Sequence, residues 1–510
     1  MPCQSGQSSR ANAERSCRRP STQRMKIAKG KLLLVLGVVV ALSRAVSATD
    51  VERPNIIFMI ADDQGWDGLS VTMAPDVPAS TVFHTPRLEA FAAQGRRFSN
   101  AYAPAPVCSP SRISIQCGRT PAALHWTKAA PPETGHRLIE PKITKSISRE
   151  AVTIGEVLQG AGYATAHYGK WHIGGGGPGE HGYDEHDGDT GNEQAFAFRD
   201  PNPVDLFGMA TRSEAFMRRS QEAGKPFYVQ LSWNALHAPG NSLAKTKAKY
   251  AALAGGGGRS KRADVAAITE DLDTAVGMVL DAVDRLGLAG TTYVIYTSDN
   301  GSGGGGRRGA LSGGKGSVWE GGIRVPFIVR GPGIAAGSWC HLPIVGWDLL
   351  PTFCEWAKVD AARIPQEAEG GSLVDLFARG DDGRIDRRRE ELVFHFPHYQ
   401  SGHAPHAAIR VGNLKVIEFF EDSSLKLFDL SVDPAERRDL ALERPDDAEV
   451  LRRRLDNYLV NVDAQMPIPD PAFDSAAPPP PEKPRDGRKQ EGMKQGGKKR
   501  GSMKNQARNK

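Results

Sequence analysis

One segment of the sequence brings together residue types that can bind an anion. Residues 108–119 read Cys-Ser-Pro-Ser-Arg-Ile-Ser-Ile-Gln-Cys-Gly-Arg. Proline is common in the first turn of a helix, so Pro110 predicts that Cys108 stands at a helix N-terminus. Free backbone N–H groups and the helix dipole favour an anion at that end. Arg112 lies one helical turn further on and adds a forked cationic donor, so the segment predicts an anion site that contains a cysteine.

Further polar residues directly follow apolar runs that predict buried strands. Residues 55–61 form an apolar run, as expected of a strand buried on both faces, and Asp62 and Asp63 follow it. Open α/β sheets place their sites at the carboxyl ends of strands, which is where these polar residues would stand. The other predicted strands and their polar followers are residues 163–168 with Gly169-Lys170-Trp171-His172, residues 226–233 with His237, residues 291–297 with Asp299 and Asn300, and residues 326–329.

Helical patterns between these strands indicate the fold class. In residues 265–286, apolar side chains recur every three or four positions up to Gly287. Strands that alternate with helices predict an α/β fold with helices on both faces of the sheet, and we assign it to residues 54–385. The pattern changes at about residue 390, and residues 390–465 predict a small α+β subdomain. Its expected elements are strands at residues 407–410, 414–419 and 426–430 and a helix at residues 446–460.

The N-terminal region has the pattern of an export signal. Residues 32–42 form an apolar run of 11 residues, which is too short to span a bilayer comfortably. Three lysines precede the run and Val46-Ser47-Ala48 follows it, so residues 1–48 predict a leader and signal peptide cleaved after Ala48, with Met25 as an alternative start. An uncleaved anchor is the alternative. We expect a periplasmic or extracellular protein with no stable membrane span.

The C-terminal region differs in composition from the rest. Residues 466–510 contain a proline run and many basic residues without apolar periodicity, which predicts a disordered basic tail. Either a solvated tail without a specific partner or a tail that contacts acidic polymers by charge fits this composition. Of the formal net charge of +6, residues 1–31 carry +7 and residues 481–510 carry +8, which leaves −9 for residues 32–480. Because the body is mildly acidic, we expect no nucleic-acid partner.

The segment at residues 108–119 resembles the signature of the sulfatase family. Cys-Ser-Pro-Ser-Arg followed by Gly118-Arg119 is similar to the family's Cys-x-Pro-Ser-Arg with a later Gly-Arg. The resemblance is to the arylsulfatase and carbohydrate sulfatase type of the alkaline-phosphatase-like superfamily, which implies a large mixed β-sheet flanked by helices. It also implies that a formylglycine-generating enzyme converts Cys108 to formylglycine (3-oxoalanine). The resemblance covers about residues 54–465.

The same resemblance implies a metal site. Asp62-Asp63 and Asp299-Asn300 are similar to the two pairs of metal ligands of the family. Four oxygen side chains and an oxygen on residue 108 suit one hard cation such as Ca²⁺, with ligands at about 2.3–2.6 Å. The sequence has no obvious His/Cys cluster around these residues, which argues against zinc.

Three more motifs resemble characteristic sequence boxes of the family. They are Gly-Lys-Trp-His at residues 169–172, His-Ala-Pro at residues 237–239, and Lys315 before the Glu-Gly-Gly turn at residues 320–322. In this chemistry one hydroxyl of hydrated formylglycine attacks sulfur, and the second is deprotonated so that sulfate leaves. A serine lacks the second hydroxyl and cannot complete the cycle.

The resemblance also implies a role for each matched residue. Arg112, Lys170 and Lys315 would hold the sulfate oxygens and stabilise their charge in the transition state. His237 would protonate the departing alcohol with the help of Lys315, and His172 would take the proton from the second hydroxyl.

The resemblance implies a secreted sulfatase that acts on sulfate esters, with sulfated carbohydrates as the expected substrates and other small sulfate esters open. A phosphodiesterase or phosphonate monoester hydrolase of the same superfamily is one alternative, although the boxes at residues 169–172 and 237–239 favour sulfate. A non-catalytic glycan-binding relative is another, but it should lack a ligand or the nucleophile, and none is missing here.

Two groups of residues have no firm assignment. His395, His398, His403 and His406 crowd one short segment, and we favour a role at the surface or in substrate recognition over a metal site. Cys340 and Cys354 could form a disulfide, which the sequence leaves open.

Overall fold

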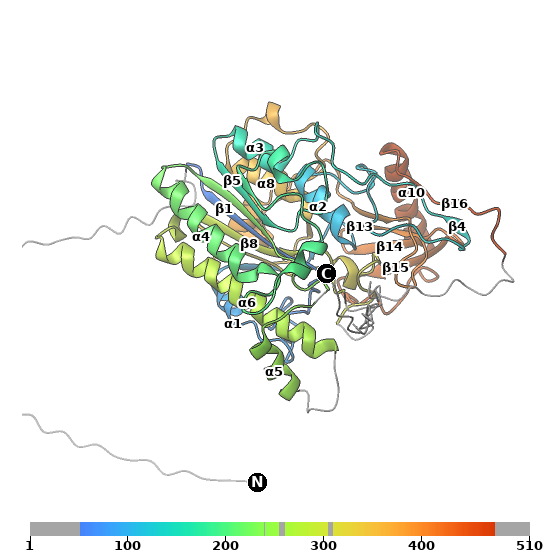
Figure 1. Cartoon of the computed structure of the whole chain (residues 1–510). Helices are drawn as coiled ribbons and strands as arrows, with labels where there is room; N and C mark the ends of the chain where they lie inside the picture. The colour runs from blue at the N-terminus through green and yellow to red at the C-terminus, as the bar shows by residue number, and fades with distance from the viewer. Residues whose placement is uncertain (1–51, 239, 254–260, 304–309, 475–510) are drawn as a thin grey trace, which may run out of the picture. The chain divides into compact units, whose positions relative to one another are not determined.

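The computed structural model describes residues 52–238, 240–253, 261–303 and 310–474, and within them a mixed sheet of eight strands forms the centre of the fold (Figure 1). Strands β8, β1, β7, β5 and β6 pair in parallel, whereas β9 pairs antiparallel with both β8 and β2. The sheet is therefore mixed, as the family resemblance implied. In spatial order the strands are β10 (Ser338–Cys340), β2 (Arg96–Phe98), β9 (Phe327–Arg330), β8 (Thr292–Ser298), β1 (Asn55–Ala61), β7 (Phe227–Ser232), β5 (Ala164–Gly169) and β6 (Glu185–His186).

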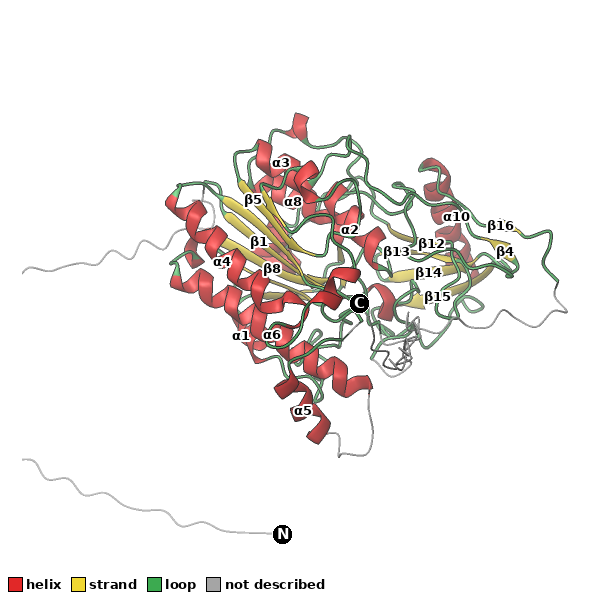
Figure 2. Ribbon diagram, in the orientation of Figure 1, coloured by secondary structure: helices red, strands yellow, loops and turns green. Residues whose placement is uncertain are grey.

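Helices cover both faces of this sheet (Figure 2). Alternate side chains of β1 point into two separate cores, with Ile57 and Met59 in one and Ile56 and Phe58 in the other. The prediction of a strand buried on both faces is confirmed. The first core is closed by α1 (Pro86–Gln94), α4 (Leu206–Glu222) and α6 (Lys261–Arg285), and the second by α2 (Cys108–Cys117), α3 (Ile154–Gly160), α8 (Leu349–Trp356) and α9 (Val374–Arg379).

A second sheet follows in the sequence and forms the expected C-terminal α+β unit. Its four strands are antiparallel and lie in chain order. Helix α10 (Pro445–Asn461) packs on one face, and the other face packs on Tyr102, Val318 and Trp347. The strands are β12 (Leu392–Phe396), β13 (His406–Val411), β14 (Leu414–Phe419) and β15 (Ser424–Asp429).

Short elements complete the described residues. Strands β3 (Ala101–Tyr102) and β11 (Ile344–Val345) pair in parallel, α5 (Ala244–Leu253) packs against α6, and α7 (Glu320–Ile323) is a single turn. The 3-10 helices are η1 (Pro178–His181), η2 (Glu193–Ala197), η3 (Pro203–Asp205), η4 (Ala289–Thr291), η5 (Gly346–Asp348), η6 (Ala361–Arg363) and η7 (Gly380–Asp382).

The expected boundary of the C-terminal tail needs correction. We predicted disorder from residue 466, but β16 (Ile468–Pro469) pairs antiparallel with β4 (Leu138–Ile139). The backbone N–H of Asp470 also donates to the carbonyl of Arg137 at 2.9 Å. The segment is ordered because a partner strand more than 300 positions earlier satisfies its backbone. Residues 475–510, like the predicted signal peptide at residues 1–48, lie outside the described residues.

Two further observations concern cysteines and membranes. Cys340 and Cys354 are both buried and unbonded, so they do not form the disulfide that the sequence left open. Over the described ranges, no helix has both the length and the apolar character needed to cross a bilayer.

Candidate active site

The carboxyl ends of two neighbouring parallel strands bring two pairs of polar residues together. Strands β1 and β8 are in register, with Ala61 opposite Ser298. The next residues are Asp62 and Asp63 on one side and Asp299 and Asn300 on the other, and Asp62, Asp299 and Asn300 are fully buried. This confirms the expected placement of polar residues at strand ends.

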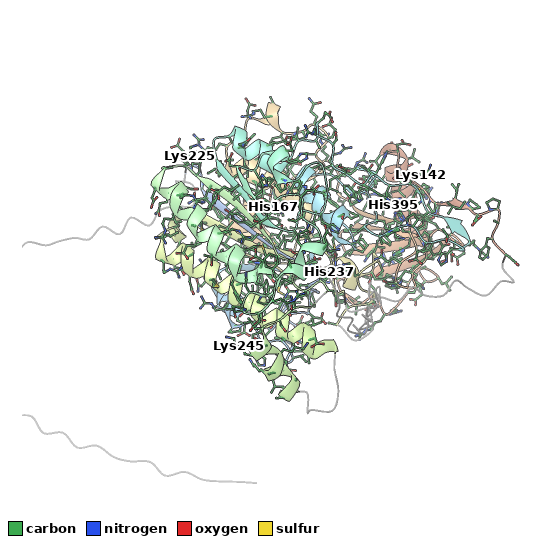
Figure 3. The ribbon with its side chains drawn as sticks, viewed as in Figure 1. Lys142, His167, Lys225, His237, Lys245 and His395 are labelled. Atoms are coloured by element: carbon green, nitrogen blue, oxygen red, sulfur yellow. The ribbon has the colours of Figure 1, made fainter. Side chains whose placement is uncertain are left out.

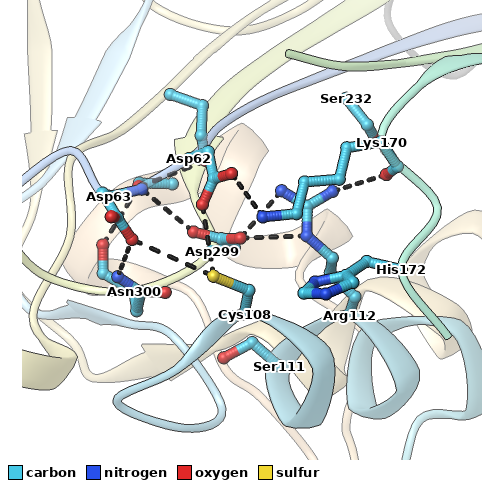
Figure 4. Close-up of polar contacts among 12 residues, drawn as sticks. Asp62, Asp63, Cys108, Ser111, Arg112, Lys170, His172, Ser232, Asp299 and Asn300 are labelled. Atoms are coloured by element: carbon cyan, nitrogen blue, oxygen red, sulfur yellow. Dashed lines mark hydrogen bonds and ion pairs between the residues drawn. The ribbon is translucent and has the colours of Figure 1, made fainter. Parts of the chain in front are cut away.

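Helix α2 points its N-terminus at these residues (Figure 4). Cys108 is its first residue and is only 2% exposed, and its thiol donates to Oδ1 of Asp62 at 3.3 Å. No side chain caps this end of the helix. Instead, Oγ of Ser111 accepts from the N–H of Ala105 and donates to its carbonyl, which fixes the chain just before the helix. The positive end of the helix therefore stands at the site without a side-chain cap, as the sequence predicted.

Three cationic side chains surround residue 108. Lys170 forms an ion pair with Oδ2 of Asp62 at 2.5 Å, and both side chains are fully buried. Nε of Arg112 donates to Oδ2 of Asp299 at 2.9 Å. Nζ of Lys315 donates to Asp63 and, at 3.2 Å, to the sulfur of Cys108. This arrangement can hold a tetrahedral anion against residue 108.

The acidic residues fit a hard cation. Ligand atoms of Asp62, Asp63, Cys108 and Asp299 all lie within 4.8 Å of one another. Oδ1 of Asn300 is buried and has no hydrogen-bond partner, although its Nδ2 donates to Asp63 at 2.8 Å. A buried amide oxygen without a partner is costly and calls for a ligand. Oxygen donors of this kind suit Ca²⁺ or a similar ion better than zinc.

The electrostatics of the pair Asp62 and Asp299 follow from burial and from the nearby cations. Burial alone would raise the pKa of Asp62, but Lys170, His237 and Arg112 outweigh it and hold that pKa well below its usual value. Burial and the charge of Asp62 raise the pKa of Asp299 to about 6. Two carboxyl groups so close disfavour each other's charge, which is the situation that a bound cation relieves.

The thiol of Cys108 is poorly suited to act as a nucleophile. Burial, followed by the charge of Asp62, raises its pKa well above the usual value. The thiolate, which is the reactive form, is therefore disfavoured. An unmodified cysteine protease-like mechanism does not fit this environment.

Both candidate proton-transfer histidines are neutral in this environment. Burial, followed by Lys170, lowers the pKa of His172 to about 2, and burial lowers that of His237. Nδ1 of His172 lies 3.2 Å from Oγ of Ser109, and Nδ1 of His237 donates to the carbonyl of Ala238 at 2.8 Å. The other ring nitrogen of each histidine is left for a substrate or for residue 108.

Sequence reasoning missed residues that position His172. Thr190 holds the preceding turn: its Oγ1 accepts from the N–H of Trp171 at 3.0 Å, and its carbonyl accepts from the N–H of His172 at 2.7 Å. His172 has a φ of 61°, and Asp63 has a φ of 65°. Left-handed backbone at non-glycine residues is uncommon and clusters at functional sites. No local motif marks Thr190, because it acts from a loop 18 positions away.

The histidines of the C-terminal sheet have a different role from the one we favoured. His395, His398 and His406 are 3%, 1% and 0% exposed, so these three are not surface residues, whereas His403 is half-buried and the expected role stays a prediction for it. His398 bridges Thr127 and Glu140, and His406 accepts from the N–H of Val318. Figure 3 labels His395 in the four-stranded sheet and His237 near the large one. The acidic group around Cys108 is the candidate metal cluster found among the described residues, and it contains no histidine.

Comparison with known proteins agrees with this geometry. The sequence matches the family profile described as Sulfatase over residues 54–359, and the profile described as N-sulphoglucosamine sulphohydrolase, C-terminal, over residues 314–465. Arylsulfatase A of Bos taurus is 28% identical over 492 residues, covering 81% of this chain and 90% of the relative. N-acetylgalactosamine-6-sulfatase of Sus scrofa is 30% identical over 381 residues, covering 66% of this chain and 68% of the relative.

Solved structures show the same fold. The crystal structure of Ps i-CgsB in complex with k-i-k-neocarrahexaose superposes with a TM-score of 0.65 at 22% identity, covering 80% of this chain and 93% of that chain. At this level of identity the likeness concerns the fold alone, and it supports the alkaline-phosphatase-like architecture expected from the sequence.

Proposed function

The chain belongs to the sulfatase family and is a sulfuric ester hydrolase, and from this premise we propose that it removes sulfate from carbohydrates with a formylglycine made from Cys108. The observation that carries the mechanism is the position of Cys108. Its buried side chain lies at a helix N-terminus, between acidic residues on one side and Lys315 on the other. The carbohydrate assignment is supported by the match to an N-acetylgalactosamine-6-sulfatase.

Residue 108 supplies the nucleophile in this proposal. Hydrated formylglycine offers one hydroxyl to attack sulfur and a second one whose deprotonation allows sulfate to leave. His172 is the proposed base for that deprotonation, because burial keeps its imidazole neutral and Ser109 orients the ring through Nδ1. Thr190 keeps the turn that bears His172 in place.

The cationic side chains are proposed to bind the sulfate group. Arg112 and Lys170 are fixed by Asp299 and Asp62, so their charges are oriented before substrate arrives. Lys315 is 18% exposed and therefore stands closest to solvent among the three. Oriented charges in a buried site stabilise developing negative charge without reorganising in the transition state.

His237 is the proposed acid for the departing alcohol. Burial lowers its pKa, so the ring is neutral in the free site and must first take up a proton; once protonated, it would release that proton readily to the alcohol. Lys315 is the neighbouring cation that assists by stabilising the alkoxide charge.

Asp62, Asp63, Asp299 and Asn300 are the proposed ligands of one Ca²⁺ ion, together with residue 108. A cation at this place would polarise the hydroxyl on residue 108 and neutralise the adjacent carboxylates. The unpartnered Oδ1 of Asn300 supports this assignment.

Export is also part of the proposal. The basic, apolar and small-residue pattern of residues 1–48 supports a cleaved signal peptide and a periplasmic or extracellular location. The proposed maturation partner is a formylglycine-generating enzyme.

The test is to produce the protein with and without a formylglycine-generating enzyme. Mass spectrometry of the peptide that contains residue 108 measures the conversion, and paired sulfate and phosphate esters measure the chemistry. We expect sulfatase activity in proportion to conversion, and activity on position-defined sulfated sugars. Faster hydrolysis of phosphodiesters, or full activity without conversion, would contradict the proposal.

A further inference from the structure

A buried charge network joins the turn that carries Lys315 to the C-terminal sheet. Glu320, which begins α7, is fully buried. Its Oε1 accepts from Nζ of Lys415 on β14 at 2.9 Å, and its Oε2 accepts from the hydroxyl of Tyr102 at 2.7 Å. Lys415 forms a second ion pair with Glu436 at 2.8 Å, and Glu436 in turn accepts from the N–H of Glu320 at 2.6 Å. One lysine of the C-terminal unit thus holds two acidic side chains.

We call residues 312–322 the Lys315 turn. Its two ends meet, because the N–H of Gly321 donates to the carbonyl of Ser312 at 2.7 Å. The turn is tight at Gly322, where a Cβ atom would lie 1.9 Å from the carbonyl oxygen of Ser317. Most of the turn has no helix or strand structure of its own, so other parts of the protein must set its position.

The C-terminal unit makes further contacts with the same turn. Oγ of Ser312 donates to the carbonyl of Ala435 at 2.6 Å, and the N–H of Val318 donates to Nε2 of His406 at 3.0 Å. The rings of Trp319 and Phe428 lie 5.4 Å apart. The C-terminal unit therefore contacts both flanks of Lys315 in the turn, whereas the N–H groups of Lys315 and Gly316 donate to the carbonyls of Ser302 and Pro106 at 3.0 and 2.9 Å.

Buried ion pairs are a poor means of adding stability, because desolvation offsets much of the attraction. Their distances and angles are specific, however, and so they fix geometry. Lys315 has a flexible four-carbon side chain whose Nζ must lie beside residue 108. A displacement of about 1 Å in a catalytic group can cost about a hundredfold in rate.

We propose that Lys415, Glu436 and Glu320 are positioning residues that hold Lys315 beside residue 108. Through them, the C-terminal unit contributes to catalysis without touching the reacting atoms. This inference rests on the proposed role of Lys315 in sulfate ester hydrolysis.

The test is a double-mutant cycle on the matured enzyme with a small aryl sulfate. Lys415→Met leaves the two carboxylates without their shared cation, and we expect kcat/KM to fall about tenfold to a hundredfold. In a Lys315→Ala background the same change should cost less than about threefold, because the group that it positions is already gone. The calcium concentration for half-maximal activity should stay unchanged, since the ligands of the ion are not displaced.

Arg387→Met is the matched control. The side chain of Arg387 is 8% exposed and forms an ion pair with the buried Asp348, with 2.8 Å from Nε to Oδ1 and 2.6 Å from Nη2 to Oδ2. This pair anchors the start of α8 rather than the Lys315 turn. We expect Arg387→Met to lower the melting temperature, as Lys415→Met does. Unlike Lys415→Met, it should change kcat/KM by the same factor in the wild-type background and in the Lys315→Ala background.

Hydrogen exchange gives a measurement that does not depend on activity. Amides of residues 312–322 should exchange at least tenfold faster in Lys415→Met than in wild type, and at an unchanged rate in Arg387→Met. If Lys415→Met does not fold, the milder Glu436→Gln should show the same pattern to a smaller degree. A wild-type enzyme inactive on sulfate esters would refute the proposed function, while the exchange data would still decide whether Lys415 orders the turn.

Three results would overturn the inference. They are additive effects of Lys415→Met and Lys315→Ala, unchanged exchange in residues 312–322 in both Lys415→Met and Glu436→Gln, and a weakened calcium response in Lys415→Met. The last would show that the network acts through Asn300 and Gly301 instead, since Gly301 donates to the carbonyl of Gly322 at 2.9 Å.

Discussion

The ammonium group of Lys315 lies 3.2 Å from the sulfur of Cys108, although the two residues are 207 positions apart. The thiol also contacts Asp62, so residue 108 stands between a cation and an acidic cluster. In the proposed mechanism, residue 108 supplies an oxygen nucleophile and then carries a sulfate, and it would need both neighbours. Lys315 would stabilise the sulfate, and the acidic cluster would hold a metal that polarises the oxygen.

Replacing Cys108 with Ser should abolish turnover while leaving the fold intact. A serine hydroxyl can attack sulfur but has no second hydroxyl with which to release the sulfate, so the enzyme should stop after one cycle. We expect kcat to fall by at least ~10³-fold. Steady-state turnover and the mass of the residue-108 peptide after exposure to substrate measure both effects.

Cys117→Ala is the control, because Cys117 is also buried in α2 but at its far end. It should retain activity. Multiple turnover by Cys108→Ser or Cys108→Ala at a rate near that of wild type would refute the mechanism.

Removing calcium should inactivate the enzyme and lower its stability. Ligand binding to the folded state adds about 3 kcal/mol when the free ion is at a hundred times its dissociation constant. Asp299→Asn keeps the shape of the side chain but weakens both the metal site and the contact with Arg112. Activity and melting temperature with calcium and with chelator are the measurements.

The control for this prediction is Asp284→Asn, whose carboxylate is 55% exposed and faces Arg330. It should respond to calcium as the wild type does. If the Asp299→Asn protein kept the full calcium-dependent rise in melting temperature, Asp299 would not be a ligand.

The elements that bear the site could be predicted from sequence where the signal is local. The apolar run before Asp62 gave the bounds of β1, and Pro110 placed Cys108 at the start of α2. Strand β12 escaped notice because its sequence, Leu-Val-Phe-His-Phe, runs into Pro397 and His398, which do not favour a strand. His395 and His406 looked like surface residues until the structure showed them buried.

Other features depend on partners that no local pattern reveals. The antiparallel direction of β9, the contact of Thr190 with His172 and the network around Lys415 each join segments far apart in the chain. Hydrophobic periodicity reports which face of an element is buried, but not what it is buried against. The roles of these residues therefore became visible only once the chain was folded.

Acid should destabilise the protein through His395. Burial lowers its folded-state pKa to about 4, below the value of about 6.5 for an unfolded histidine. As the pH falls, the unfolded chain binds the proton first. The contribution of neutral His395 to the free energy of unfolding is therefore fully present above about pH 6.5 and is lost between about pH 6.5 and 4. The loss amounts to about 3 kcal/mol.

The measurement is urea unfolding of wild type and His395→Gln from pH 7.5 to 4.5 at constant calcium. The glutamine amide can still donate to the carbonyl of Gln465, which Nε2 of His395 contacts at 2.9 Å. The variant should lose less stability on acidification than wild type. Parallel pH profiles for the two proteins would show that His395 does not titrate in this range.

Truncation after Asp474 should leave the folded enzyme intact, whereas truncation after Gln465 should weaken it. The longer protein keeps the pairing of Ile468 with Ile139 and the hydrogen bond from Asp470 to Arg137, and the shorter one loses both. We expect the melting temperature of the shorter protein to fall by a few degrees.

The residues removed from both proteins carry most of the basic charge of the tail, because residues 481–510 contain 11 Lys or Arg and three acidic residues. Both truncated proteins should keep their activity on a small aryl sulfate, since the proposed site residues all lie at or before Lys315. The full-length enzyme should bind a sulfated polysaccharide more tightly at low salt than either truncated protein does. It should lose this advantage at high salt, because interactions between exposed charges are already screened beyond about 8 Å at physiological ionic strength. An unchanged melting temperature after truncation at Gln465 would mean that β16 adds nothing to the stability of the fold. A binding advantage of the full-length enzyme that persists at high salt would mean that the tail recognises the polymer by contacts other than charge.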